Sequence, residues 1–261
     1  MVIGAGAGIG GNVAKRFAKE GFHSVLCRRS NQHGLDDLIR GIEEEGGTAS
    51  GFLINVVEPE SIEECVEKVE SDIGPIDTLV FNLGAQVGNK SLSETSYKIF
   101  ELGWRLATFS LFRTASSVLP KMEKRGKGSF LVTTSTAAFR GNAGQHSHAS
   151  AMGGRRMLCQ SLNAEFASKG IHIVHILVDG MVDAPDTLGK MMGPENFEKL
   201  RKELISSLFI LSLCWGFAVL IPWAANEGSI KSIVLLFCWL ATIFWTFGFD
   251  TVYALADKNL S

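Results

Sequence analysis

Apolar and polar positions alternate in two rhythms over the first 178 residues of the chain. Short, mostly apolar runs of strand type fall at 2–3, 23–27, 49–55, 77–82, 129–134 and 172–178. Runs of helical type, with apolar residues three or four positions apart, fall at 9–21, 35–47, 59–74 and about 149–168. Strands that alternate with helices are typical of βαβ units. The pattern therefore predicts an α/β domain built on a parallel sheet.

The segment 59–74 shows the helical rhythm most clearly. Its apolar residues share one helix face, opposite the glutamates, and they are Ile62, Cys65, Val66, Val69 and Ile73. This face is expected to pack on the sheet. Gly21 and Gly74 stand where two predicted helices should end, because glycine readily takes the left-handed conformation of a helix carboxyl cap.

The pattern changes after residue 203. Residues 204–226 and 232–249 contain no charged side chain, and a helix that crosses a membrane needs roughly 20 apolar residues. We expect a two-helix transmembrane hairpin. The alternative, a buried hairpin in a soluble core, needs protein on every side of both helices. The chain is thus predicted to have two domains, 1–200 and 201–261.

Basic residues set the expected orientation of the hairpin. Lys199, Arg201 and Lys202 directly precede its first helix, and such residues accumulate on the cytoplasmic side of membranes. Residues 1–10 lack the basic and apolar regions of a secretory signal. We therefore expect a membrane protein whose N-terminal domain lies on the cytoplasmic side.

Charge and cysteine content exclude some classes of partner. A net charge of -2 gives no argument for nucleic acid. The 5 cysteines are scattered and include no Cys-x-x-Cys pair, so neither a disulfide framework nor a zinc ribbon is predicted.

A glycine-rich loop, GAGAGIGG, follows the first predicted strand and leads into a helix. In this position glycines allow backbone N–H groups and a helix N-terminus to approach a pyrophosphate. Two spacings fit, one through Gly4, Gly8 and Gly10 and one that begins at Gly6. The alternative is a tight turn between strand and helix that binds nothing.

The second predicted strand ends in Cys27-Arg28-Arg29, without an acidic residue that could accept a hydrogen bond from a ribose hydroxyl. Two guanidinium groups suit a 2'-phosphate, so Arg28 and Arg29 predict NADP(H) as the cofactor in preference to NAD(H). The alternative is a solvated basic turn.

These motifs together resemble the short-chain dehydrogenases/reductases over residues 1–200. Gly4, Gly8, Ile9 and Gly10 resemble the family's glycine loop, Asn55 and Val56 its contact to adenine, and Asn82 and Gly84 its conserved strand end, here in DTLVFNLG. The resemblance implies a doubly wound Rossmann sheet that binds a nicotinamide dinucleotide. It also implies hydride transfer between the carbonyl and alcohol forms of a small substrate.

The catalytic positions of the family fall in and before the stretch GQHSHASAM at 144–152. The resemblance places Ser135 on the catalytic serine, His148 on the tyrosine, Met152 on the lysine and Ala107 near the asparagine. A thioether cannot lower a neighbouring pKa or hold a ribose. An imidazole can protonate an alkoxide, so His148 oriented by Ser135 is the candidate acid.

Two functions remain open for the first domain. One is an NADP(H)-dependent oxidoreductase of doubtful catalytic competence. The other is a membrane-anchored nucleotide-binding module in which His148 is only a loop histidine. Zinc would need imidazoles that converge, and His146, His148, His172 and His175 are not expected to do so. We therefore predict no metal site.

The tail of the chain, which includes both predicted membrane helices, resembles a different family, the UbiA-type polyprenyltransferases, over residues 205–258. The matching stretches are LCWGFAVLIPWAA and FWTFGFDTVYALADK. The resemblance implies that Asp250 and Asp257 correspond to part of a site for Mg²⁺ and a prenyl diphosphate. The motif is incomplete, so we expect no prenyl transfer. A fusion and a gene-model error both explain how such a fragment could follow the first domain.

Overall fold

The computed structural model describes residues 1–84, 90–178 and 193–199, together with residues 182, 202, 236 and 240. The chain divides into two compact units, Met1–Met181 and Val182–Ser261. All the helices and strands named below belong to the first unit.

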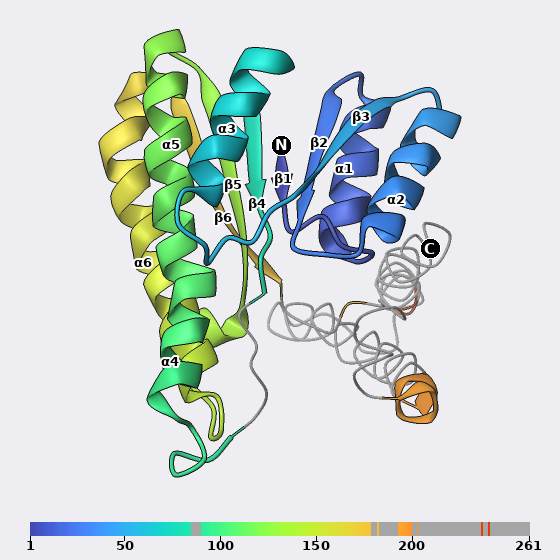
Figure 1. Cartoon of the computed structure of the whole chain (residues 1–261). Helices are drawn as coiled ribbons and strands as arrows, with labels where there is room; N and C mark the ends of the chain where they lie inside the picture. Colours follow the sequence, from blue (N-terminus) through green and yellow to red (C-terminus); the bar gives the residue numbers. More distant parts are fainter. Residues whose placement is uncertain are drawn as a thin grey trace. The chain divides into compact units, whose positions relative to one another are not determined.

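The strands of the first unit form one parallel sheet (Figure 1). They are β1 (Val2–Ile3), β2 (His23–Arg28), β3 (Thr48–Leu53), β4 (Thr78–Phe81), β5 (Gly128–Ser135) and β6 (Ile171–Val178), and their order is β3-β2-β1-β4-β5-β6. Successive strands are added outward on one side of β1, from β2 to β3, and then on its other side, from β4 to β6, so the strand order reverses between β1 and β4. In doubly wound sheets a ligand binds outside the carboxyl ends of the strands at such a switch point.

Helices cover both faces of this sheet (Figure 1). They are α1 (Ile9–Lys19), α2 (Gln32–Glu44), α3 (Ser61–Asp72), α4 (Tyr97–Trp104), α5 (Ser110–Arg125) and α6 (His146–Phe166). A π-helical turn, Arg105–Phe109, joins α4 to α5 without a break. Side chains that alternate along the strands reach two separate cores. Val2, Leu26 and Val80 pack with α1 and α2, whereas their neighbours in sequence pack with α3, α5 and α6.

The predicted α/β Rossmann-like fold is therefore confirmed. Gly21 and Gly74 lie just beyond the ends of α1 and α3 with φ values of 89° and 147°, as expected of glycines that terminate helices. The sequence pattern predicts no helix over residues 97–125. It predicts that the last helix of this unit begins at about Ala149, whereas α6 begins at His146 and carries both His146 and His148 in its first turn.

The predicted membrane hairpin lies outside the described residues, except for Leu236 and Leu240. Asp250 and Asp257 also lie outside them. Within the part of the chain that the structure describes, no helix is both long enough and apolar enough to cross a membrane.

Candidate active site

The glycine loop at the carboxyl end of β1 is held by the backbone of β2. The Gly4 and Ala5 amides both donate to the Cys27 carbonyl, each at 2.9 Å. Gly4 has φ 94°, and a Cβ there would lie 2.5 Å from the Asn82 carbonyl oxygen. A Cβ at Gly10 would lie 2.1 Å from the Gly4 carbonyl oxygen. Both positions therefore require glycine for steric reasons.

This geometry distinguishes the two possible spacings of the loop. A Cβ at Gly6 would meet nothing within 4 Å, so Gly6 is not sterically required. A Cβ at Gly11, which ends the second spacing, would lie 2.4 Å from the Gly6 carbonyl oxygen. Apart from the shared Gly8, the spacing that begins at Gly6 thus contains one sterically required glycine, whereas the spacing through Gly4 and Gly10 contains two. Gly8 directly precedes α1, which begins at Ile9 with no acidic residue in its first turn. The Gly11 amide in this turn donates to the Gly6 carbonyl at 2.8 Å. The positive end of the helix dipole nevertheless favours an anion at the N-terminus of α1.

Asn82 joins the glycine loop to the next strands. Its side-chain amide donates to the Gly4 carbonyl at 3.1 Å, and its side-chain oxygen accepts from the Thr133 hydroxyl at 2.7 Å. Its backbone amide donates to the Ile3 carbonyl at 2.8 Å. Gly84 follows two residues later, with open space where a Cβ would stand. Asn82 therefore has a structural role that fixes the shape of the loop.

Arg28 and Arg29 lie at the end of β2, at the same edge of the sheet as the glycine loop. Arg28 is half-buried and Arg29 is exposed. A Cβ at Gly34 would lie 3.0 Å from Nη1 of Arg28, so this guanidinium lies against the first turn of α2. Within residues 1–84 and 90–178, neither guanidinium makes a hydrogen bond or an ion pair. Both remain available to a bound anion.

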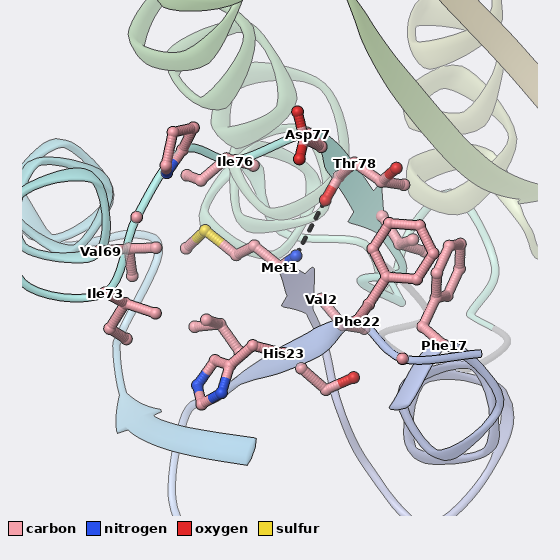
Figure 2. A pocket seen from close by; sticks show the side chains of 16 residues that line it. Met1, Val2, Phe17, Phe22, His23, Val69, Ile73, Ile76, Asp77 and Thr78 are labelled. Atoms are coloured by element: carbon pink, nitrogen blue, oxygen red, sulfur yellow. Dashed lines mark hydrogen bonds between the residues drawn. The ribbon is translucent and has the colours of Figure 1, made fainter. Parts of the chain in front are cut away.

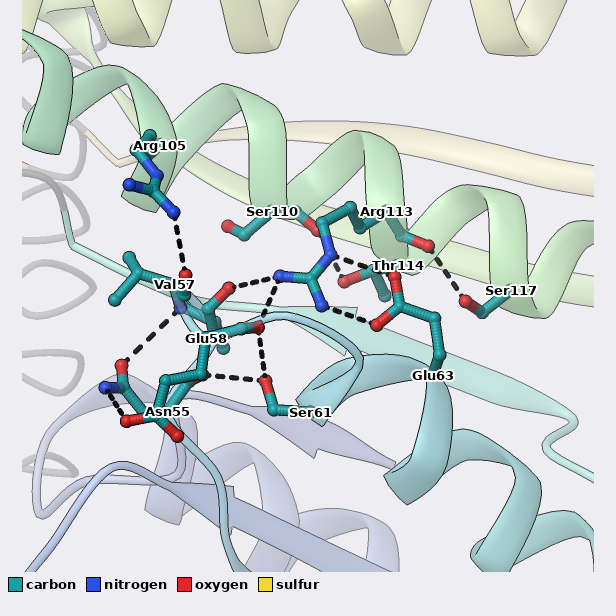
Figure 3. Close-up of polar contacts among 11 residues, drawn as sticks. Asn55, Val57, Glu58, Ser61, Glu63, Arg105, Ser110, Arg113, Thr114 and Ser117 are labelled. Atoms are coloured by element: carbon teal, nitrogen blue, oxygen red, sulfur yellow. Dashed lines mark hydrogen bonds and ion pairs between the residues drawn. The ribbon is translucent and has the colours of Figure 1, made fainter.

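Asn55 and Val56 lie on the loop between β3 and α3, which two arginines hold in place (Figure 3). Arg113 donates to the Val56 and Glu58 carbonyls at 2.8 and 2.9 Å, and Arg105 donates to the Val57 carbonyl at 2.9 Å. Arg113 also forms a two-point ion pair with Glu63 on α3. These hydrogen bonds hold the pKa of Glu63 below its usual value.

Ser135 and His148, which the family resemblance places at catalytic positions, lie together. Ser135 is the last residue of β5, and His148 lies in the first turn of α6. The Ser135 hydroxyl and His148 Nε2 are 3.2 Å apart, within hydrogen-bond distance. The pair can therefore share a proton, and the hydroxyl can orient the imidazole.

Met152 lies one turn further along α6 and is only 2% exposed. Its sulfur accepts a hydrogen bond from the Thr134 hydroxyl at 3.3 Å. Thr133 and Thr134, both in β5, are engaged in such internal contacts. Met152 therefore fills the core beneath this site and contributes no charge to it.

Arg155 is the residue at this site that the sequence analysis missed. It is 1% exposed and donates to the carbonyls of Ala107, Thr133 and Leu83 at 3.2, 2.8 and 2.8 Å. Burial lowers its pKa to about 10, so the guanidinium stays protonated at neutral pH. The Arg155 side chain thus links the π-helical turn to the carboxyl ends of β4 and β5.

The histidines do not assemble into a metal site. Among the described residues, no three His, Cys, Asp or Glu side chains lie close enough together to hold a metal ion. His172 is exposed on β6, and the half-buried His175 lies beside the Phe139 ring, with centroids 6.4 Å apart.

A cavity of about 320 Å³ lies at the opposite, amino-terminal edge of the sheet (Figure 2). At this edge β1 pairs only with the later part of β2, with Val2 opposite Leu26, and His23, which lines the cavity, has no partner in β1. Met1 lies beside it and donates from its amino group to the Thr78 carbonyl at 2.9 Å. The cavity is remote from the glycine loop, and we assign no dinucleotide contact to it.

Comparison with known families gives an independent view of the same residues. The family described as short chain dehydrogenase matches residues 1–190. The chain is 30% identical over 190 residues to the 3-oxoacyl-acyl-carrier-protein reductase FabG of Escherichia coli (strain K12), covering 72% of this chain and 74% of that protein. It is 28% identical over 200 residues to the 7alpha-hydroxysteroid dehydrogenase of the same strain, covering 77% and 76%.

Solved structures share the fold. A short-chain dehydrogenase from Rhodopseudomonas palustris has a TM-score of 0.64 and 32% identity, covering 67% of this chain and 82% of that chain. A 7alpha-hydroxysteroid dehydrogenase in complex with NADH and 7-oxo glycochenodeoxycholic acid has a TM-score of 0.64 and 29% identity, covering 67% and 68%.

Proposed function

Because the chain belongs to the short-chain dehydrogenase family, we propose that its first unit is an NADP(H)-dependent oxidoreductase of low turnover. It would interconvert a small carbonyl compound and the corresponding alcohol. The observation that carries the proposal is the arrangement at the carboxyl edge of the sheet. A glycine loop that admits no side chain at Gly4 or Gly10 leads into the N-terminus of α1, beside two arginines.

The preference for NADP(H) rests on Arg28 and Arg29. Within the part of the chain that the structure describes, neither forms an ion pair, and β2 ends without an acidic side chain at this position. Two guanidinium groups can hold a phosphate by charge and by paired hydrogen bonds. A ribose hydroxyl offers them no negative charge, so NADH is expected to bind more weakly.

The proposed chemistry rests on the contact between Ser135 and His148. When bound, the nicotinamide supplies or accepts a hydride. His148 Nε2 would give a proton to the alkoxide that forms on reduction, and the Ser135 hydroxyl would orient the ring and the substrate oxygen. Turnover is expected to be slow, because no ammonium stands at position 152 to assist the acid.

A second candidate function is dinucleotide binding without catalysis. The buried, uncharged Met152 favours it, since its sulfur is already engaged with Thr134. The two candidates differ in one measurement. A His148→Ala variant would lose NADPH oxidation in the presence of small carbonyl compounds if His148 is the acid, and would be unchanged if it is not.

NADPH titration tests the shared part of both candidates. Arg28→Glu with Arg29→Glu should weaken NADPH binding by at least about a hundredfold, because the two cations proposed to hold the 2'-phosphate become two anions that repel it. Each factor of ten corresponds to about 1.4 kcal/mol. NADH binding should change much less. A matched control reverses two exposed charges elsewhere, Lys19→Glu with Lys124→Glu. Saturable NADPH binding that survives in the Arg28/Arg29 variant would contradict the assignment.

We also propose that residues 201–261 anchor the protein to a membrane, with the first unit on the cytoplasmic side. The support is the uncharged sequence at 204–226 and 232–249 and the basic residues before it. Recovery of the full chain in the supernatant after alkaline carbonate extraction would contradict this. The likeness to polyprenyltransferases carries no activity, so Asp257→Asn should leave any Mg²⁺-dependent diphosphate release unchanged.

A further inference from the structure

Two buried cysteines meet in the core next to the proposed dinucleotide site. Cys27 lies on β2 and Cys65 on α3, and their sulfur atoms are 3.9 Å apart. Both belong to the same hydrophobic core, with exposures of 0% and 6%. All three cysteines in the described residues are free thiols, and the third, Cys159, lies on α6. The contact between Cys27 and Cys65 is therefore a pair of reduced thiols poised next to each other.

Each cysteine is connected to a wall of the proposed dinucleotide site. The Cys27 carbonyl accepts the hydrogen bonds from Gly4 and Ala5 that hold the glycine loop, and Arg28 is the next residue. Cys65 lies in the first half of α3, which directly follows the loop that carries Asn55 and Val56. A displacement of either sulfur would consequently move residues of that site.

The two thiols differ in acidity in a way that suits successive reaction steps. The hydrogen bond with Cys27 and the nearby Lys68 ammonium lower the pKa of Cys65. The hydrogen bond with Cys65 and complete burial raise the pKa of Cys27. Since the thiolate is the nucleophile, Cys65 is the residue that would react first with an oxidant.

We propose that Cys27 and Cys65 form a redox switch, in which a disulfide made by peroxide weakens the binding of NADP(H). The Cys65 thiolate attacks one oxygen of hydrogen peroxide, which gives a sulfenic acid and releases hydroxide. The Cys27 thiol gives its proton to the departing hydroxyl group as its sulfur attacks the Cys65 sulfur, which forms the S–S bond, breaks the S–O bond and releases water. Two thiols and one peroxide thus give one disulfide and two waters, and a dithiol reductant reverses the reaction.

The S–S bond requires movement of the protein. The sulfur atoms must approach from 3.9 Å to about 2.05 Å. Cys27 is fixed on both sides, with Phe52 of β3 and Ile3 of β1 as its partners in the sheet. Apart from rotation of the two side chains, the approach can come only from movement of α3 and its preceding loop toward β2 or from a tilt of the Cys27 peptide. Either movement displaces groups that surround the adenosine: Asn55 and Val56 in one case, the glycine loop and Arg28 in the other.

The effect on affinity rests on the proposed function, whereas the cross-link does not, so the experiment measures them separately. The full chain is treated with hydrogen peroxide, its remaining thiols are alkylated, and its peptides are mapped without reduction. We expect one dominant cross-link, between the peptides that contain Cys27 and Cys65. Cys65→Ser and Cys27→Ser should each abolish it, whereas Cys159→Ser should not. Absence of this cross-link in the wild-type protein would overturn the proposal.

NADPH titration of the same samples measures the consequence. The oxidised wild-type protein should bind NADPH at least about tenfold more weakly than the reduced protein, and a dithiol should restore the affinity. Cys65→Ser should bind alike with and without peroxide. A cross-linked protein with unchanged affinity would overturn the regulatory role. If the reduced protein binds no NADPH, the proposed function fails and the switch with it, while the peptide map still decides whether the disulfide forms.

Discussion

At the scale of single residues, the glycine loop is defined by close backbone contacts. Gly4 and Gly10 are excluded from carrying a side chain by the carbonyl oxygens of Asn82 and Gly4, whereas Gly6 faces open space. A phosphate would approach the same backbone. A side chain that displaces this backbone should therefore weaken dinucleotide binding before it affects the rest of the fold.

Substitution of two of these glycines by alanine tests that difference. Gly10→Ala should weaken NADPH binding by at least about tenfold, because the methyl group displaces the Gly4 carbonyl and opens the loop. Gly6→Ala makes the same chemical change in open space and should alter affinity less than about twofold. NADPH fluorescence titration measures both. If Gly6→Ala proved the more damaging change, the spacing that begins at Gly6 would be the correct one.

Arg155 shows which residues the sequence could not predict. Glycines, the Arg28-Arg29 pair and the contact of Ser135 with His148 follow from local spacing or from the family resemblance. Arg155 depends on three carbonyls that come together only in the folded chain, those of Leu83, Ala107 and Thr133. One signal was present: Arg155 shares the buried face of α6 with Ala151, Met152 and Cys159. An arginine on such a face indicates a buried hydrogen-bonded network.

At the scale of elements, Arg113 on α5 connects three parts of the site. It pairs with Glu63 on α3 and donates to two carbonyls of the loop that carries Asn55 and Val56. Its side chain is 11% exposed. Lys121 pairs with Glu67 between the same two helices, but Glu67 is 68% exposed. The two ion pairs therefore form an internal comparison of a buried link with an exposed one.

Arg113→Met should lower the free energy of unfolding by about 2 kcal/mol or more, because it leaves two loop carbonyls and a carboxylate without their donor. It should also weaken NADPH binding, since the loop is no longer held. Lys121→Met should cost less than about 1 kcal/mol, as is usual for exposed pairs. Urea unfolding followed by circular dichroism measures both. Equal losses in the two variants would contradict a special role for Arg113.

The elements themselves were predicted unevenly. Strands bounded by turns and helices with one apolar face were recognised, because their periodicity is local. The helical region 97–125 was not, and the structure explains why. Its π-helical turn shifts the register between α4 and α5, and aromatic side chains such as Trp104 and Phe112 stay exposed. These features interrupt the helical period near residues 104–112, although the buried positions of α5 from Leu111 to Met122 recur every three or four residues.

At the scale of the whole molecule, stability should rise between pH 6 and pH 8 if Met1 carries a free amino group. Burial lowers the pKa of that group from 8.0 to about 6. In this interval the unfolded chain therefore binds more protons than the folded one, and protonation favours unfolding. The gain can reach roughly 2–3 kcal/mol at 1.36 kcal/mol per pKa unit. Burial and two arginines lower the pKa of His175, which adds in the same direction.

Urea unfolding at pH 6 and pH 8 measures this change, and a chain acetylated on Met1 is the control that should lose most of it. Stability that is the same at pH 6 and pH 8 would show that the Met1 amine is solvated.

A second decline in stability is expected on acidification below the usual range of glutamate. The pKa of Glu63 is lowered in the folded state, so its stabilising contribution is present above that range and is lost as the carboxylate is protonated.

The position of β1 in the sheet has a consequence for the order in which the chain can fold during synthesis. Val2 pairs with Leu26 on one side and with Val80 on the other, and the Asn82 that holds the glycine loop is itself held by Thr133. At roughly 5–20 residues per second, the ribosome needs on the order of ten seconds to pass from the first of these residues to the last. The loop at the start of the chain is thus completed late, and a nascent chain acquires its cofactor affinity only after β5 has emerged.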